Sequence, residues 1–186
     1  MKSPTENLRD MAYHLYLSNI SSEVLENPKF SIWSGSSKPY LHHYGRGQLA
    51  QHTMEVIDLC FQNNIYLGKP IDERKLFLAA LFHDVGKMWD YQPVKVDNYD
   101  EWEGTKHKRQ VHHISRSALV WNEIIVKYTD TIDEPDDVLH AILAHHGCRE
   151  WGSPVIPNTK LAWMLHLCDG ISARMNDADK LDMIVK

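Results

Sequence analysis

The sequence predicts an all-α domain, folded as a helical bundle. Two observations carry this prediction: six segments repeat apolar residues at helical spacing, and no segment alternates convincingly with a period of two. With 186 residues, the chain is expected to form a single domain over residues 1–186 with a sizeable buried core. That core is expected over about residues 30–175, with an N-terminal helix packed on it.

The first half of the chain is predicted to contain three helices. Apolar residues recur on one side of residues 5–19, which predicts the first. Residues 28–47 are rich in Pro, Ser and Gly and are predicted to form a loop, and a second helix is expected over residues 48–66. Asp72 can cap the third helix, in which residues 76–82 are apolar nearly all round. Such a helix is typical of the centre of a domain.

The second half is predicted to contain three more helices. Residues 89–105 are predicted to form a long loop of aromatic and acidic residues, a kind of loop that is often functional. A fourth helix is expected from about residue 106 or 112 to residue 128. Acids and a proline at 133–135 are typical of the first turn of a fifth helix. Thr159 can cap a sixth helix, which is expected to end at about Arg174.

Composition narrows the classes of function. The net charge of −5 gives no basic signature for nucleic-acid binding, so any such contact would have to be local. The three cysteines lack paired spacing, which argues against a disulfide framework and favours a reducing cytosol. Cys60 and Cys168 lie in apolar helical runs and are expected in the core. No signal peptide and no apolar run of about 18 residues is present, so a cytoplasmic protein without membrane contact is expected.

Ionisable residues stand in four apolar helical segments where aliphatic residues would be expected. His83 and Asp84 end the most apolar helix, and an uncompensated charge there would be costly. The other three segments supply the remaining candidates: His52, His145-His146 and Asp169. Each of them, taken alone, is explained as a core residue whose hydrogen bonds are satisfied. That explanation must, however, hold independently in four segments. One shared metal site explains them together. His113 shares a helix face with Ser117, Val120 and Ile124 and is expected to point inward as well.

The remaining histidines are weaker candidates. His112 is expected to face outward, and His14 and His140 are interpreted as surface residues. For His42, His43 and His107, a plain surface or loop position is the simplest interpretation, and a role in the site stays open.

The order His52…His83-Asp84…Asp169 resembles the signature of the HD superfamily of metal-dependent phosphohydrolases. The additional His113 and His145-His146 resemble its two-metal branch, and more narrowly the catalytic domain of the YhaM-type 3′–5′ exoribonucleases. Five blocks carry this likeness: residues 42–53, 81–87, 113–114, 144–154 and 165–169. The chain departs from those exoribonucleases in having no room for their N-terminal single-strand-binding module in residues 1–30. It also has Ser172 and Arg174 where they usually have an acid and a lysine.

The resemblance implies two divalent metal ions that share Asp84. One would be held by His52, His83, Asp84 and Asp169. The other would be held by Asp84, His113, His145 and His146. Ligands of these types suit Mn, Fe, Co, Ni or Zn. Such ions lie about 3.5–4 Å apart and activate a bridging water for attack on phosphorus.

Four further residues are candidates for contact with the substrate. Lys87 is the best candidate for a phosphate contact and a catalytic role, the alternative being a solvated lysine at a helix end. Arg116, one turn beyond His113, could bind phosphate as well. His166, one turn before Asp169, could orient a ligand or act as a general acid. Arg174 is a weaker substrate-binding candidate, because a helix-terminal arginine usually serves the helix dipole.

Three functions compete at this stage. The leading one is a phosphodiesterase or phosphohydrolase that acts on nucleotides or on the 3′ ends of short single-stranded RNA or DNA. The basic run 106–109 is a candidate for guiding such a strand, with Trp89, Tyr91 or Trp102 as candidate stacking surfaces. The alternatives are a mixed-valent di-iron oxygenase with similar ligands and a nucleotide-binding protein without catalysis. A homo-oligomer is also a possibility.

Overall fold

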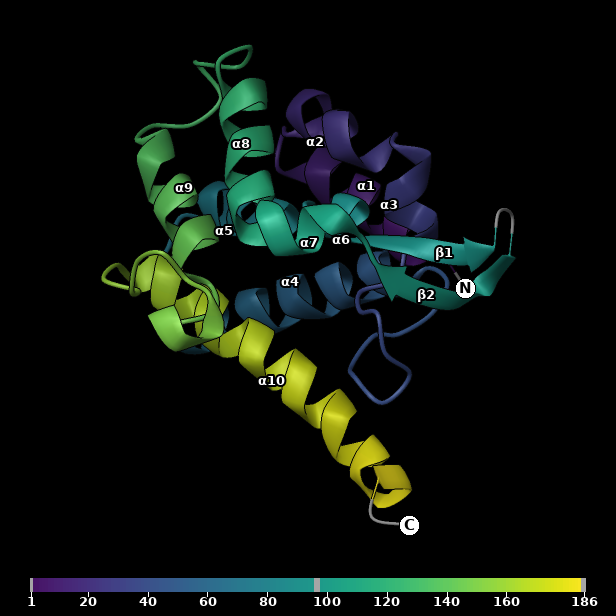
Figure 1. Cartoon of the computed structure of the whole chain (residues 1–186). Coiled ribbons are helices and arrows are strands. Elements are labelled where there is room, and N and C mark those ends of the chain that lie inside the picture. Colours follow the sequence, from purple (N-terminus) through teal and green to yellow (C-terminus); the bar gives the residue numbers. More distant parts are fainter. Residues whose placement is uncertain (1, 96–97, 185–186) are drawn as a thin grey trace.

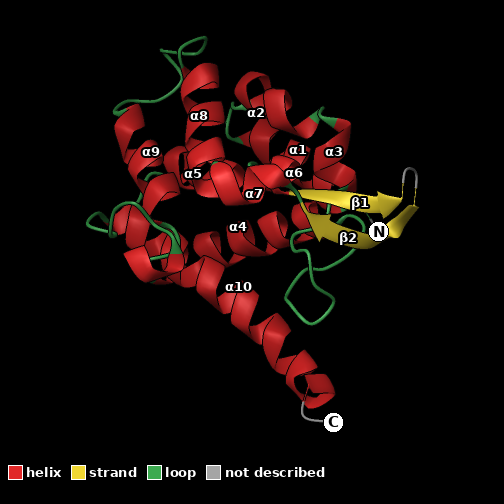
Figure 2. Ribbon diagram, viewed as in Figure 1, coloured by secondary structure: helices red, strands yellow, loops and turns green. Residues whose placement is uncertain are grey.

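The computed structural model describes residues 2–95 and 98–184, and for residues 176–184 it describes the backbone only. The fold is all-α, as predicted, with one small two-stranded sheet (Figure 2). The helices and strands follow in this order: α1 (Pro4–His14), α2 (Ser18–Leu25), α3 (Pro28–Ile32), α4 (Gln48–Tyr66), α5 (Glu73–Phe82), α6 (Lys87–Asp90), β1 (Tyr91–Lys95), β2 (Asn98–Gly104), α7 (Lys106–Gln110), α8 (His113–Ile125), α9 (Pro135–Ala144), the 3₁₀ helix η1 (Arg149–Trp151) and α10 (Lys160–Ile184).

Helix α5 lies at the centre of the bundle, where α2, α4, α8, α9 and α10 pack around it. All seven apolar residues of its stretch 76–82 are buried, which confirms the predicted central helix. The Asp72 side chain accepts hydrogen bonds from the backbone N–H groups of Arg74 and Lys75, so the predicted cap is also confirmed. Figure 1 shows α10 crossing below α4 and extending away from the body at its C-terminal end.

The predicted second and fifth helices are confirmed as α4 and α9, with Pro135 in the first turn of α9. The first predicted helix is wrong as a single element. Two helices, α1 and α2, replace it, because the backbone at Tyr16 turns to a φ of 58°. Of the two starts expected for the fourth helix, the one near residue 112 is confirmed: α8 begins at His113, and α7 is a separate helix that ends before His112, where φ is 68°. Helix α3 lies inside the predicted loop 28–47, and α10 continues beyond Arg174.

The prediction of a loop over residues 89–105 is wrong, because most of this segment forms an antiparallel hairpin of β1 and β2. Most of its side chains are exposed on both faces, so the sequence shows no period of two. Trp102 is buried against Trp33, with ring centroids 5.2 Å apart, and the Trp33 Nε1 donates a hydrogen bond to the Tyr91 carbonyl. The hairpin is therefore anchored to the domain by aromatic packing.

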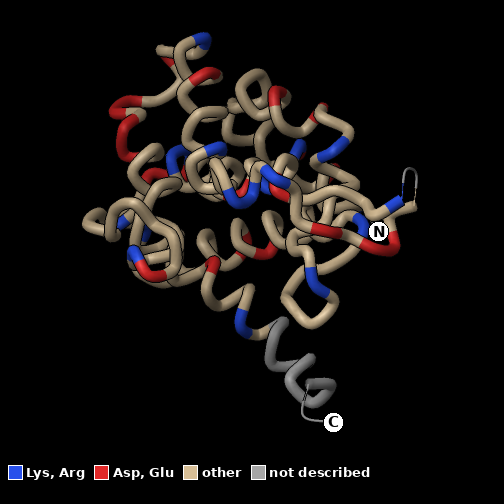
Figure 3. Tube along the Cα trace, in the orientation of Figure 1, with Lys and Arg blue, Asp and Glu red and all other residues tan. Residues whose placement is uncertain are grey.

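Charge is unevenly distributed over the surface. Figure 3 shows the Lys and Arg residues of α7 near the middle of the view, whereas acidic residues gather at the start of α9. Among the described residues, none of the helices is both long enough and apolar enough to span a bilayer.

Candidate metal centre and active site

The seven candidate metal ligands converge from five helical regions of the bundle. His52 lies within α4 and Asp169 within α10, His83-Asp84 directly follows α5, His113 begins α8, and His145-His146 directly follows α9. Gly86 explains how α8 comes so close to Asp84. A Cβ atom on Gly86 would lie 2.2 Å from the carbonyl oxygen of His113, so only glycine permits this approach.

Asp84 occupies the centre of the cluster and is buried. Its Oδ2 lies 3.3 Å from the Nε2 atoms of both His52 and His83. Its Oδ1 lies 3.5 Å from Nε2 of His113 and 3.7 Å from Nε2 of His145. Each carboxylate oxygen thus faces a different pair of histidines.

The two outer ligands complete these two groups. Asp169 Oδ1 lies 3.1 Å from Nε2 of His52, on the Oδ2 side of Asp84. The Nε2 of His146 lies 3.3 Å from that of His113, on the Oδ1 side. Two sets of three, His52-His83-Asp84 and His113-His145-His146, have ligand atoms close enough together to hold a metal ion each.

The hydrogen bonds of the outer ring nitrogens fit a metal centre. The Nδ1 atoms of His83, His145 and His146 each lie 2.7 Å from a backbone carbonyl oxygen. A carbonyl can only accept, so each Nδ1 carries the proton and each Nε2 points a lone pair into the cluster. Asp84 Oδ1 and His145 Nε2 are also buried without a hydrogen-bond partner among the described residues. Uncompensated burial of such atoms is costly, and a bound cation would satisfy both.

Asp90 orients His113 and was not anticipated from the sequence. Its buried carboxylate accepts hydrogen bonds from the backbone N–H of His113, at 3.0 Å, and from Nδ1 of the same residue, at 3.2 Å. It also lies 2.7 Å from Nδ1 of His107. A carboxylate behind a metal-binding histidine fixes the tautomer and raises its basicity. The available signal was an acid closely following the buried His83-Asp84 pair.

A second supporting network lies behind His52. The Ser172 hydroxyl is 3.1 Å from Nδ1 of His52 and donates to Oε2 of Glu55 at 2.9 Å. The same Oε2 lies 2.9 Å from Nε2 of His43, which is buried rather than on the surface. Burial raises the pKa of Glu55, but hydrogen bonds from His43, Gln51 and Ser172 lower it to about 2. Glu55 is therefore an anionic acceptor behind the cluster.

The protonation of the cluster follows from burial and charge. Burial alone would raise the pKa of Asp84, but the positive charge of Lys87 and the closeness of His83 and His52 hold it well below its usual range. Burial lowers the pKa of His113 to about 4, against the opposing effect of Asp90, so this imidazole is neutral at pH 7. The pKa of His52 is raised despite its burial, because Asp169 and Asp84 accept its hydrogen bonds.

A polar cavity of about 370 Å³ opens onto the cluster. Lys87, His166 and Arg174 all contribute to its wall, together with Asp169 and Trp151. The remaining lining residues are the following: His42, His145, His146, Gly170 and Ala173. Of the four residues expected to contact substrate, three are therefore brought to one cavity.

Lys87 is buried, so the interpretation as a solvated lysine is wrong. Its Nζ lies 2.6 Å from Oδ2 of Asp84. His166 packs directly on the backbone of Gly147, and its Nδ1 lies 2.8 Å from the His145 carbonyl oxygen. This ring therefore also supports the loop that carries His145.

Arg116 lies outside the lining of this cavity. Its Nε donates to Nε2 of His107 at 3.1 Å, and its guanidinium lies 5.3 Å from the centre of the Trp89 ring. Of the aromatic residues considered as stacking surfaces, Tyr91 and Trp102 are buried, which removes them from that role. His112 is half-buried rather than turned outward, with its ring centroid 4.1 Å from that of His113.

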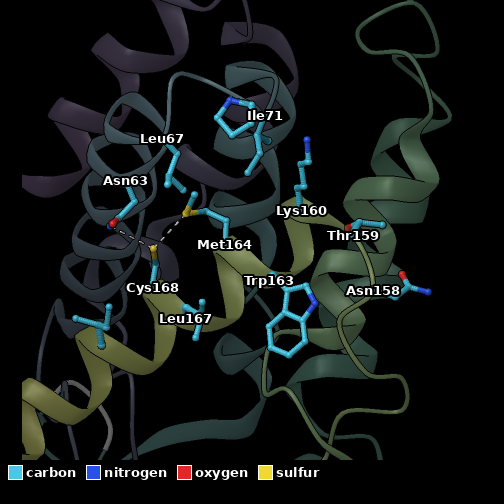
Figure 4. A pocket seen from close by; sticks show the side chains of 12 residues that line it. Asn63, Leu67, Ile71, Asn158, Thr159, Lys160, Trp163, Met164, Leu167 and Cys168 are labelled. Carbon is cyan, nitrogen blue, oxygen red and sulfur yellow. Dashed lines mark hydrogen bonds between the residues drawn. The ribbon is translucent and has the colours of Figure 1, made fainter.

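A larger groove of about 750 Å³ lies between the end of α4 and the first half of α10 (Figure 4). Its lining is mostly apolar and includes Leu67, Trp163, Met164 and Leu167. Asn63 donates toward the sulfur of Cys168 within it. None of the candidate metal ligands lines this groove, so the smaller polar cavity is the candidate active site.

An all-α bundle that gathers histidines and aspartates from several helices around one carboxylate defines a helical metal-binding domain. The family model of the HD domain matches residues 49–174, a span that contains all seven candidate ligands. The chain belongs to the HD-domain family, whose members are generally hydrolases of phosphoesters. No solved structure gave a significant match to the chain.

Proposed function

We propose that this protein is a metal-dependent phosphodiesterase or phosphohydrolase that cleaves phosphoester bonds of nucleotides, including those at the 3′ ends of short RNA or DNA. One observation carries the proposal. Asp84 turns one carboxylate oxygen to His52 and His83 and the other to His113 and His145, next to a polar cavity that His145 and Asp169 line. That is the ligand arrangement a bridged pair of metal ions needs.

The residues present fit two divalent ions. His52, His83, Asp84 and Asp169 would hold one, and Asp84 with the three histidines of the second group would hold the other. Mn, Fe, Co, Ni and Zn all accept imidazole and carboxylate ligands. When bound, such a pair lowers the pKa of a shared water and stabilises charge that develops on phosphoryl oxygens.

The protein's own groups bind and orient the phosphate. Lys87 stays protonated, because Asp84 raises its pKa above the usual range although burial opposes this. Its fixed positive charge at the cavity wall can pair with a non-bridging phosphate oxygen. Arg174, from the same wall, supplies a second cation for the phosphate.

His166 is the candidate for proton transfer. Its Nδ1 proton is held by the His145 carbonyl oxygen, so the ring orientation is fixed. The remaining nitrogen, Nε2, is then the atom that can exchange a proton with the leaving oxygen of the substrate.

A metal analysis combined with a substrate screen tests the proposal. Purified protein loaded separately with Mn, Fe, Co, Ni or Zn is offered cyclic nucleotides, dinucleotides, short RNA and DNA, and nucleoside mono- and triphosphates. We expect metal-dependent release of mononucleotides or phosphate from at least one class. Inertness across the panel at full metal loading would refute the proposal. A mixed-valence EPR signal after anaerobic iron loading would instead support the di-iron oxygenase.

A further inference from the structure

Trp151 differs from the other tryptophans of the chain. The chain has six. The rings of Trp33 and Trp102 contact each other, and Trp121 contacts Phe82. Trp163 contacts His166, and the guanidinium of Arg116 lies over Trp89. Trp151 alone has no aromatic or cationic ring partner among the described residues, and 60% of its surface is exposed. It nevertheless lines the polar cavity.

The backbone of Trp151 is fixed directly to the ligand cluster. Its carbonyl oxygen accepts the hydrogen bond from Nδ1 of His146 at 2.7 Å. The next residues continue this attachment, because buried Ser153 accepts a hydrogen bond from the His146 backbone N–H at 3.1 Å. The indole is therefore a flat apolar surface carried by a backbone that is held beside the cluster. It lines the cavity and is largely exposed to solvent.

The other walls of the cavity are suited to a phosphate. Lys87 and Arg174 supply positive charge, and the candidate ligands His145, His146 and Asp169 lie on the same lining. The volume of about 370 Å³ is near the lower end of the range for small-molecule pockets, about 300–1,000 Å³. The cavity thus fits a single nucleotide unit rather than several.

We propose that Trp151 is the stacking platform for the nucleobase of the scissile nucleotide, whose phosphate lies at Lys87 and the ligand cluster. The proposal rests on the proposed function, since it takes the polar cavity as the substrate site. Stacking on an indole uses the face of the base, which every base has. The site therefore recognises a nucleotide by the presence of a base, with little dependence on which base it is.

Equilibrium binding of reaction products tests this without requiring turnover. The metal-loaded full chain is titrated with AMP, UMP and ribose 5-phosphate by calorimetry, and the ratio of the ribose 5-phosphate Kd to the AMP Kd measures the contribution of the base. We expect a ratio of about 5–150 in the unaltered protein, the value of one base stacked on an aromatic ring. In Trp151→Ala the ratio falls toward one while the affinity for ribose 5-phosphate is kept. Trp151→Phe retains most of the ratio.

Tyr66→Ala is the matched control, because Tyr66 is an aromatic side chain that is 87% exposed on α4. It should leave the ratio unchanged. An unchanged ratio in Trp151→Ala would overturn the proposal. Equal loss of AMP and ribose 5-phosphate binding together with loss of metal would also overturn it, by assigning the indole a purely structural role.

The outcomes separate this proposal from the proposed function. A protein that hydrolyses phosphoesters but has a ratio near one in its unaltered form would retain the function and lose the platform. A protein with a Trp151-dependent ratio and no hydrolysis of any substrate would retain the platform and lose the function.

Discussion

Helix α10 forms a wall of two cavities with opposite character. Toward the polar cavity it turns His166, Asp169 and Arg174, and toward the apolar groove it turns Met164 and Leu167. With Gly170 and Ala173 on the polar side and Cys168 and Ile171 on the apolar side, both linings recur at three- and four-residue spacing, so each follows one face of the helix. On one face of α10 the helical period turns apolar side chains toward α4. On the other face it turns ionisable groups toward the polar cavity. Substitutions on the two faces should therefore separate stability from activity.

The largest effect is expected at the centre of the ligand cluster beside the polar cavity. Asp84→Asn keeps the shape of the side chain but removes the charge that both histidine groups face. Removing a single group that stabilises a transition state already costs about 10²–10³ in rate. We therefore expect kcat/KM to fall more than about 1,000-fold, measured on whichever substrate the screen identifies.

A folding control is needed for that variant, because Asp84→Asn leaves the buried Lys87 without its partner. An unpaired buried charge costs about 3–5 kcal/mol. The double variant Asp84→Asn/Lys87→Met removes the charge and should fold with the same loss of activity. Appreciable activity in a folded, metal-loaded Asp84→Asn protein would refute the central role of this carboxylate.

The apolar groove should show the opposite behaviour. Met164 is nearly buried and contacts Cys168 through sulfur at 3.8 Å. Met164→Ala is expected to lower the free energy of unfolding by about 2–3 kcal/mol, measured by urea denaturation. Activity per folded molecule should not change. Leu167→Ser, at a position 56% exposed, is the matched control and should change stability by less than about 0.5 kcal/mol. A large drop in activity with Met164→Ala would show that the two faces of α10 are coupled.

A smaller effect is expected behind the ligands. Asp90→Asn replaces the carboxylate that accepts from His113 and lies beside His107 with a neutral amide. Metal affinity should fall by about 10–100-fold, as is usual for residues that orient metal ligands. Competition with a chelating indicator measures it. The exposed acid Asp58 provides the control, and Asp58→Asn should leave the affinity unchanged. Equal affinities in both variants would contradict the orienting role of Asp90.

The pH dependence of stability should originate from the ligand cluster. Burial lowers the pKa values of His113 and His145 in the folded protein. As the pH falls below about 6.5, these two imidazoles are therefore protonated in the unfolded chain before they are protonated in the folded protein. The raised pKa of His52 adds stability only while the pH falls to about 6.5 and adds no slope below it, because both states then carry that proton. The two protons of His113 and His145 therefore predict that the free energy of unfolding of chelator-treated protein falls by about 2.7 kcal/mol per pH unit between about pH 6 and pH 5.

Urea denaturation at pH 7 and pH 5 measures this slope. Met164→Ala should lower the free energy of unfolding by the same amount at both pH values, because the methionine side chain does not titrate. A stability that is flat across this pH range would contradict the lowered pKa values of the two histidines.

The sequence predicted the helices with the strongest apolar periodicity well. Helices α4, α5 and α9 were predicted from that pattern, because a helix that buries one face repeats its apolar residues at helical spacing. The choice between a helix start at 106 and one at 112 could not be made from the sequence, since it depends on a positive φ at His112 that local spacing does not reveal. The hairpin was missed because most of its side chains are exposed on both faces, so only a few aromatic contacts hold it to the domain.

The candidate site divides in the same way. Ionisable residues in apolar helices were sufficient to nominate the ligands, since unpaired charge in a core is costly. Asp90 and Glu55 were missed because each contacts residues from another segment of the chain. Arg116 shares the helix face of His113, but the helix turns its guanidinium to Trp89 and His107 instead of to the cavity.

The sequence by itself determined which helices bring ionisable groups into the core, because the apolar period fixes which face of each helix is buried. Only the tertiary structure decided that these groups meet around Asp84, with one oxygen toward each pair of histidines. It also decided that Lys87 is buried against that carboxylate. The physical reason is that the distances between helix ends depend on how the helices cross and on close approaches such as that of Gly86, which no local pattern records.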